Sequence, residues 1–99
     1  MAASDLGRAV TRMLTRAGHA RYGKGAGFKL VLTADSALVV WIPETRRRSA
    51  ERLADALAEA EAHAASARAA GWDAVLADDC GWPACRVSRQ SQAKAARPW

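Results

Sequence analysis

The stretch FKLVLTADSALVVWIP, residues 28–43, decides the predicted fold. FKLVLT alternates as a strand does, ADS supplies turn residues, and ALVVWI follows as a second strand that Pro43 ends. We therefore expect an antiparallel hairpin here. The second strand, residues 37–42, is apolar on both faces, which predicts a central place in the sheet or a second covered face.

A helix is predicted before this hairpin, over residues 5–17. Apolar residues recur there at helical spacing, and Ser4 is in a suitable position to act as the N-cap. Gly18 ends the pattern, as a residue just after a helix commonly does.

A longer helix is predicted after the hairpin, with Ser49 as its N-cap and Gly71 as its stop. One of its faces carries two leucines followed by alanines, which permit close approach to a sheet. This face consists of Leu53, Leu57, Ala60, Ala64 and Ala67. His63 is expected at the surface of this helix or at its boundary.

Two further strands are predicted over residues 72–77 and 84–88, joined by a turn over 78–83. The order α-β-β-α-β, with a fourth strand, predicts an α+β fold with two helices on one face of a small, mostly antiparallel sheet. A right-handed crossover through the long helix would set the third strand parallel to one hairpin strand. Residues 1–88 are expected to form one domain, and residues 89–99 a basic, flexible tail.

The charge balance favours polyanions as partners. Fifteen Lys and Arg oppose ten Asp and Glu, for a net charge of +5 and a pI near 10.0. Nucleic acid, DNA or RNA, is the first such partner to consider. The N-terminus has no apolar signal region, and no apolar run is long enough to span a bilayer, so we expect a cytoplasmic protein without membrane contact.

Three basic segments are candidate nucleic-acid contacts: a stripe on the first helix, the glycine-rich loop over residues 18–27, and a cluster before the second helix, where anions are favoured. In each case the alternative is a solvated charged surface or a flexible connector. The loop matches neither a P-loop nor a dinucleotide fingerprint. The candidate residues are Arg8, Arg12, Arg16, Arg21, Lys24, Arg46, Arg47 and Arg48.

Two of the four tryptophans are candidate interface residues. Trp41 lies in the second strand, where a place in the core is the simpler expectation. Trp82 lies in the predicted turn beside Gly81 and Pro83, where an exposed ring could stack or anchor an interface. The alternative for Trp82 is a ring folded back over the sheet edge.

No metal, cofactor or catalytic residue is predicted. A zinc site at Cys80 and Cys85 would need two more ligands, and His19 and His63 are far from them in sequence, without ligand-pair spacing. Neither histidine has a sequence partner that marks a catalytic triad. In a reducing compartment the two thiols are expected to be free, although the sequence leaves their pairing open.

The segment LTRAGHARYGKGAGFKLVLTADSALVVWIP, residues 14–43, resembles HicA-type toxins, which are small mRNA-cleaving proteins. In those toxins a histidine lies in or beside the first strand, whereas here His19 follows the helix stop and FKLVLT has no histidine. The resemblance implies at most one catalytic candidate, His19. The whole layout is also similar to small uncharacterised proteins of actinobacterial phages and mobile elements, which implies an accessory protein that binds nucleic acid or a host factor.

The sequence therefore indicates three candidate functions. The first is a non-catalytic nucleic-acid-binding protein of phage or mobile-element type. The second is a protein-interaction module, as a homodimer or an inhibitor of a host protein, because Val31, Val39 or Trp41 could lie on an uncovered sheet face. The third is a ribonuclease of the HicA type that uses His19 as general acid or base.

Overall fold

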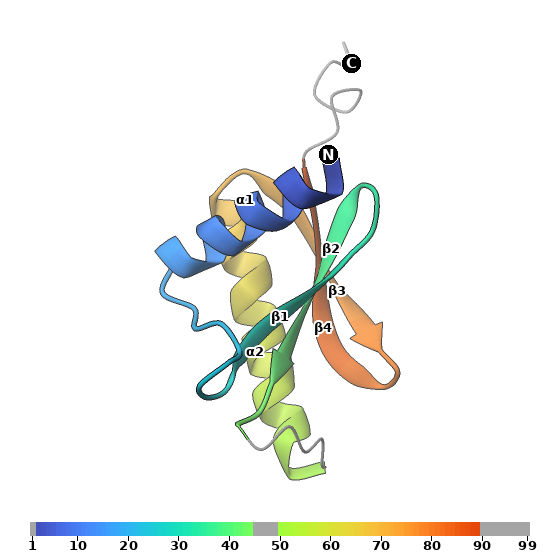
Figure 1. Ribbon diagram of the computed structural model, residues 1–99. Helices are drawn as coiled ribbons and strands as arrows, with labels where there is room; N and C mark the ends of the chain where they lie inside the picture. Colours follow the sequence, from blue (N-terminus) through green and yellow to red (C-terminus); the bar gives the residue numbers. More distant parts are fainter. Residues whose placement is uncertain (1, 45–49, 90–99) are drawn as a thin grey trace.

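The computed structural model describes residues 2–44 and 50–89, which form an α+β fold in the order α-β-β-α-β-β (Figure 1). Both helices contribute to one cluster of buried side chains with one face of the sheet. The predicted fold class is therefore confirmed. The elements are α1 (Ala2–Arg16), β1 (Gly27–Leu32), β2 (Ser36–Ile42), α2 (Ala50–Ala69), β3 (Trp72–Asp79) and β4 (Trp82–Arg89).

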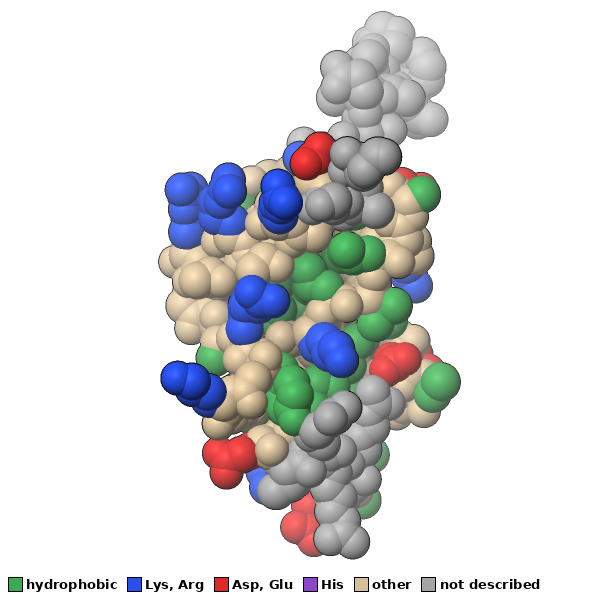
Figure 2. Space-filling view, viewed as in Figure 1, with side chains coloured by type: hydrophobic (Ala, Val, Ile, Leu, Met, Phe, Trp, Pro, Cys, Tyr) green, Lys and Arg blue, Asp and Glu red, His purple; other side chains and the backbone are tan. Residues whose placement is uncertain are grey.

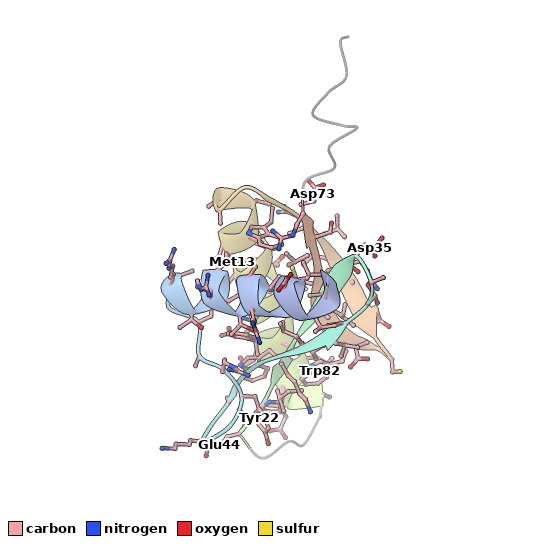
Figure 3. The ribbon with its side chains drawn as sticks, turned by 45° about the horizontal axis from the view of Figure 1, so that its top comes forward. Met13, Tyr22, Asp35, Glu44, Asp73 and Trp82 are labelled. Carbon is pink, nitrogen blue, oxygen red and sulfur yellow. The ribbon has the colours of Figure 1, made fainter. Side chains whose placement is uncertain are left out.

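The four strands form one sheet in the order β1-β2-β4-β3, and each neighbouring pair is antiparallel. β2 is central, as its doubly apolar sequence predicts. β3 runs parallel to β2, also as predicted, but β4 lies between them, so no parallel pair is hydrogen-bonded. Figure 3 shows Asp35 at the turn of the first hairpin and Tyr22 and Glu44 at its opposite end.

The turn between β3 and β4 is shorter than the sequence suggests. Only Cys80 and Gly81 separate the strands, and both have positive φ, 52° and 86°. Two such residues give the twist that a two-residue antiparallel hairpin requires. The backbone N–H of Gly81 also donates a 2.8 Å hydrogen bond to Oδ2 of Asp78. The predicted turn over residues 78–83 is therefore too long at both ends, because β3 continues to Asp79 and β4 begins at Trp82.

The end of α1 follows the sequence prediction. Gly18 has φ 95°, its N–H bonds to the carbonyl of Thr15, and the N–H of His19 bonds to the carbonyl of Leu14. These two bonds define a Schellman cap, which turns the chain sharply out of the helix. The beginning of α1 differs from the prediction, because the helix starts at Ala2 and Ser4 lies within it rather than at its N-cap.

The buried face of α2 also differs from the prediction. Leu53 and Leu57 are exposed, whereas His63 is fully buried. Alanines bring the helix axis close to the sheet, so the face that fits is rotated away from the leucines. The buried residues of α2 are Ala56, Ala60, His63, Ala64 and Ala67.

Trp82 is not in an exposed turn, so that expectation is wrong. It begins β4, its side chain is 3% exposed, and its indole Nε1–H donates a hydrogen bond to the carbonyl oxygen of Trp41. Trp41 is half-buried and packs against the buried apolar cluster that contains Trp82. Val39 is fully buried, which leaves Val31 as the exposed member of the three proposed for an uncovered face. A buried Trp82 does not present a free ring to a partner.

Several predictions fall on residues 45–49 and 90–99, which lie outside the described part of the chain. These are Ser49 as a helix cap, the cluster Arg46, Arg47 and Arg48, and the flexible tail. Among the described residues, neither helix is both long enough and apolar enough to cross a membrane.

Candidate nucleic-acid interface

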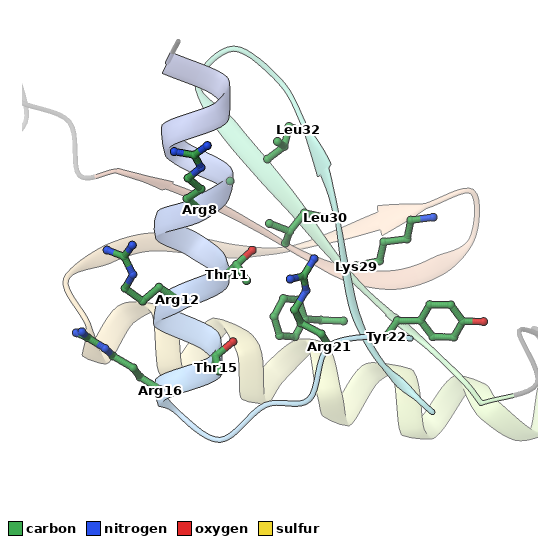
Figure 4. Close-up of a pocket in the computed structure, with 12 residues that line it drawn as sticks. Arg8, Thr11, Arg12, Thr15, Arg16, Arg21, Tyr22, Lys29, Leu30 and Leu32 are labelled. Atoms are coloured by element: carbon green, nitrogen blue, oxygen red, sulfur yellow. The ribbon is translucent and has the colours of Figure 1, made fainter. Parts of the chain in front are cut away.

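An open groove of about 920 Å³ runs between α1, β1 and the loop that joins them (Figure 4). Twelve residues line it, from Gly7 in α1 to Leu32 at the end of β1. Its walls therefore come from three consecutive segments of the chain.

Two glycines allow these segments to approach. Gly7 faces β1, because a Cβ at this position would lie 2.9 Å from Cδ1 of Leu32. Gly27 faces the backbone of Arg21, where a Cβ would overlap the main chain. The loop is held against the start of β1 by bonds from Phe28 N to Ala20 O and from Tyr22 N to Phe28 O, both 2.9 Å. These contacts fix Arg21 opposite α1.

Five cationic side chains surround this groove, and all five are exposed. Figure 4 shows Arg8, Arg12 and Arg16 along one rim and Arg21 on the other side. Residues eight apart on a helix are separated by about 12 Å along its axis. The arginine rim is therefore long enough to follow roughly three to four nucleotide steps of one strand, at about 3.4 Å each.

The groove has no acidic lining residue among those described. Within residues 2–44 and 50–89, its five cations also form no ion pair, since the ion pairs found there join other side chains. Figure 2 shows Lys and Arg side chains spread over this face, with apolar side chains between them. The charge on this surface is thus available to an external anion.

The floor of the groove combines hydroxyl and apolar groups. Thr11 and Thr15 face inward from α1 (Figure 4), and Leu30 and Leu32 contribute apolar surface from β1. Hydroxyls can donate to phosphate or sugar oxygens, and apolar surface suits the faces of unstacked bases. The arrangement can therefore contact both the backbone and the bases of a strand.

The structure brings together four of the predicted nucleic-acid contacts, namely Arg8, Arg12, Arg16 and Arg21. Lys24 is exposed in the same loop but does not line the groove. Lys29 was missed, because a single lysine at an alternating position of a strand reads as an ordinary solvated side chain.

His19 lies away from the groove lining, between the end of α1 and α2. Its Nε2 is 2.8 Å from Oγ of Ser66, and its ring meets the ring of His63 edge-on, with centroids 4.5 Å apart. No sequence pattern indicates this pairing, because the whole β1–β2 hairpin and more than half of α2 separate the two histidines along the chain.

Comparison of the chain with protein-family models, with curated proteins and with solved structures finds no match.

Proposed function

We propose that this protein binds nucleic acid without catalysis, through the groove between α1 and β1. One observation carries the proposal: five exposed cations from a helix, a loop and a strand line one groove that has no acidic lining residue among those described. Charged surfaces of a solvated protein more often intersperse both signs. An accessory role in a phage or mobile element, in the cytoplasm, is part of the same proposal.

The shape of the site favours a polymer over a small anion. The five cations are spread along an open groove rather than gathered around one point, so no single phosphate could contact them all. A strand carries a phosphate at every nucleotide, and several weak contacts then add up to useful affinity. The apolar floor favours a strand whose bases are accessible, in single-stranded RNA or DNA, over a regular duplex.

The test is a binding titration of labelled single-stranded RNA, single-stranded DNA and duplex DNA across a salt series. We expect binding at low salt that weakens steeply as salt rises, with a log–log slope of about −0.7 per phosphate contact for single strands. Affinity that stays flat across the salt series, or no binding at low salt, would contradict the proposal.

A second candidate is a protein-interaction module, which rests on the two edge strands. Val31 on β1 and Val75 on β3 are more than half exposed, and Leu76 is 49% exposed. β1 and β3 are the outer strands of the sheet, and outer strands can pair with another chain. Light scattering distinguishes the homodimer form of this candidate, which predicts twice the mass of the chain.

A further inference from the structure

Three potential metal ligands meet at the contact between the α1–β1 loop and α2. Each of His19, Glu59 and His63 offers one ligand atom, and these atoms all lie within 4.8 Å of one another. Glu59 and His63 are four residues apart on α2, so they share one face of the helix. His19 reaches the same point because the Schellman cap turns the chain there immediately after α1.

His63 is the most deeply buried of the three residues. Its side chain is 1% exposed, and its Nδ1 is a buried polar atom with no hydrogen-bond partner among the described residues. Its Nε2 lies 3.9 Å from Oε1 of Glu59, beyond hydrogen-bond distance. A buried polar group left unsatisfied destabilises a fold, so a buried imidazole without good partners calls for a physical explanation.

The surroundings hold the ring of His63 in place. The Phe28 ring meets it edge-on, with centroids 5.9 Å apart. An imidazole nitrogen that carries no proton offers a lone pair to a metal ion.

His19 is likewise oriented from outside the cluster. The 2.8 Å contact between its Nε2 and Oγ of Ser66 fixes the plane of the ring. Ligating histidines are commonly held in this way by a second hydrogen-bonding group. The Glu59 side chain is 42% exposed, against 1% for the side chain of His63.

We propose that His19, Glu59 and His63 bind a divalent transition-metal ion, with zinc as the ion that fits best. Two imidazoles and one carboxylate are a donor set for zinc rather than for magnesium or calcium, which prefer oxygen ligands. Ligands at about 2.0–2.2 Å from a tetrahedral zinc lie roughly 3.3–3.5 Å apart. The three ligand atoms, which lie within 4.8 Å of one another, would therefore have to approach by about 1.5 Å at most when the ion binds.

A metal here would connect two parts of the fold. His19 belongs to the loop that follows α1, whereas Glu59 and His63 belong to α2. The ion would link the end of α1, one wall of the groove, to the helix packed behind it. Three protein ligands leave the fourth tetrahedral position to water. This inference does not depend on nucleic-acid binding.

The experiment titrates zinc into the full chain, prepared without a histidine tag and stripped of metal with chelator, and follows heat of binding and Tm. Cobalt serves as a second probe, because its absorption reports the ligand geometry. We expect one equivalent to bind, and Tm to rise by several degrees at saturating zinc, since a ligand that binds only the folded state stabilises it.

Variants identify the ligands. Glu59→Gln and His19→Ala alter side chains that are not fully buried, so the fold should persist, and each should weaken zinc binding by at least tenfold. Glu61→Gln, an exposed carboxylate on the same helix, is the matched control and should bind as the parent does. Cys80→Ser excludes binding at the exposed thiol and should also leave the affinity unchanged.

Three outcomes would overturn the proposal. The first is absence of stoichiometric zinc binding by the folded chain. The second is binding that survives both Glu59→Gln and His19→Ala. The third is binding that is lost equally in Glu61→Gln or Cys80→Ser, which would indicate adventitious coordination at the surface.

Discussion

The indole Nε1–H of Trp82 on β4 donates a 2.9 Å hydrogen bond to the backbone carbonyl oxygen of Trp41 on β2. The two residues belong to the two central strands, beyond the last paired positions, Val40 and Ala84. The indole therefore extends the contact between these strands by one side-chain bond. Trp82 also packs in a buried apolar cluster with Leu38, Val40, Ala56 and Ala84.

Trp82→Phe should lower the free energy of unfolding by about 1–3 kcal/mol. Phenylalanine keeps most of the apolar surface but removes the N–H that donates to the part-buried carbonyl of Trp41. Urea denaturation followed by circular dichroism measures the change. Trp72→Phe is the control, because Trp72 is only half-buried, and a larger loss for Trp72 than for Trp82 would contradict this account.

Local signals in the sequence located the C-terminal ends of both helices better than the face of α2 that packs on the sheet. Gly18 and Gly71 end their helices with positive φ, 95° and 91°, as the sequence predicts. A glycine stop depends only on the chain beside it. The buried face of α2 depends on which residues the sheet can accept, and periodicity alone placed the leucines there instead of His63.

The packing of α2 predicts opposite outcomes for two neighbouring positions. Ala60 is 2% exposed against the sheet, so Ala60→Leu should destabilise the fold by about 1–3 kcal/mol through overpacking. Leu57 is 44% exposed, so Leu57→Ala should lower the free energy of unfolding by well under the roughly 2–5 kcal/mol that truncating a buried leucine to alanine costs. Urea denaturation of both variants measures this. The reverse order would place the leucine face of α2 on the core.

Only part of the groove could be predicted from the sequence, because some of its residues are brought together by tertiary contacts rather than by local spacing. Three arginines four residues apart share a helix face whatever the fold, so the stripe could be found by spacing. The approach of Arg21 and Lys29 depends on two close contacts that no local pattern reveals. One is between Gly7 and the Leu32 side chain, and the other is between Gly27 and the main chain at Arg21. The histidine cluster is likewise created by tertiary contact.

Removing two arginines from the groove should weaken nucleic-acid binding and reduce its salt dependence. Arg12→Gln with Arg16→Gln should lower the log–log salt slope by about 1.4 for single strands, because each lost phosphate contact removes about 0.7. Fluorescence anisotropy across the salt series measures both affinity and slope.

The matched control is Arg52→Gln with Arg89→Gln, which removes the same charge elsewhere. Arg52 lies 3.8 Å from Asp55 on α2, and the Arg89 guanidinium lies over the ring of Trp72. Neither side chain lines the groove. If both double variants weaken binding equally, net charge rather than the groove governs affinity.

A substitution in the turn between β3 and β4 should stabilise the fold. Cys80 has φ 52°, in the left-handed region of the backbone. Glycine and asparagine adopt this conformation readily, whereas most other residues do so at a cost in free energy. Cys80→Asn places the preferred residue before Gly81 in this turn type and should raise the free energy of unfolding by about 0.5–1 kcal/mol. Gly81→Ala, at φ 86°, should lower it by a similar or larger amount. Thermal denaturation of the two variants should therefore move Tm in opposite directions.

The two cysteines should differ in reactivity and in their effect on alkaline stability. Cys80 is exposed and Cys85 is buried, and burial raises the pKa of the Cys85 thiol to about 11 from 9.0. A maleimide at pH 8 should therefore label Cys80 in the folded protein and Cys85 only after unfolding, because the thiolate is the reactive form.

The raised pKa of Cys85 also fixes the direction of its pH effect. Between pH 9 and pH 11 the unfolded state loses the thiol proton while the folded state keeps it, so stability decreases as pH rises through this window. Two pKa units correspond to about 2–3 kcal/mol as an upper bound. Cys85→Ala removes the thiol and should flatten this part of the pH profile relative to Cys80→Ala. An unchanged slope in Cys85→Ala would show that other groups govern the alkaline loss of stability.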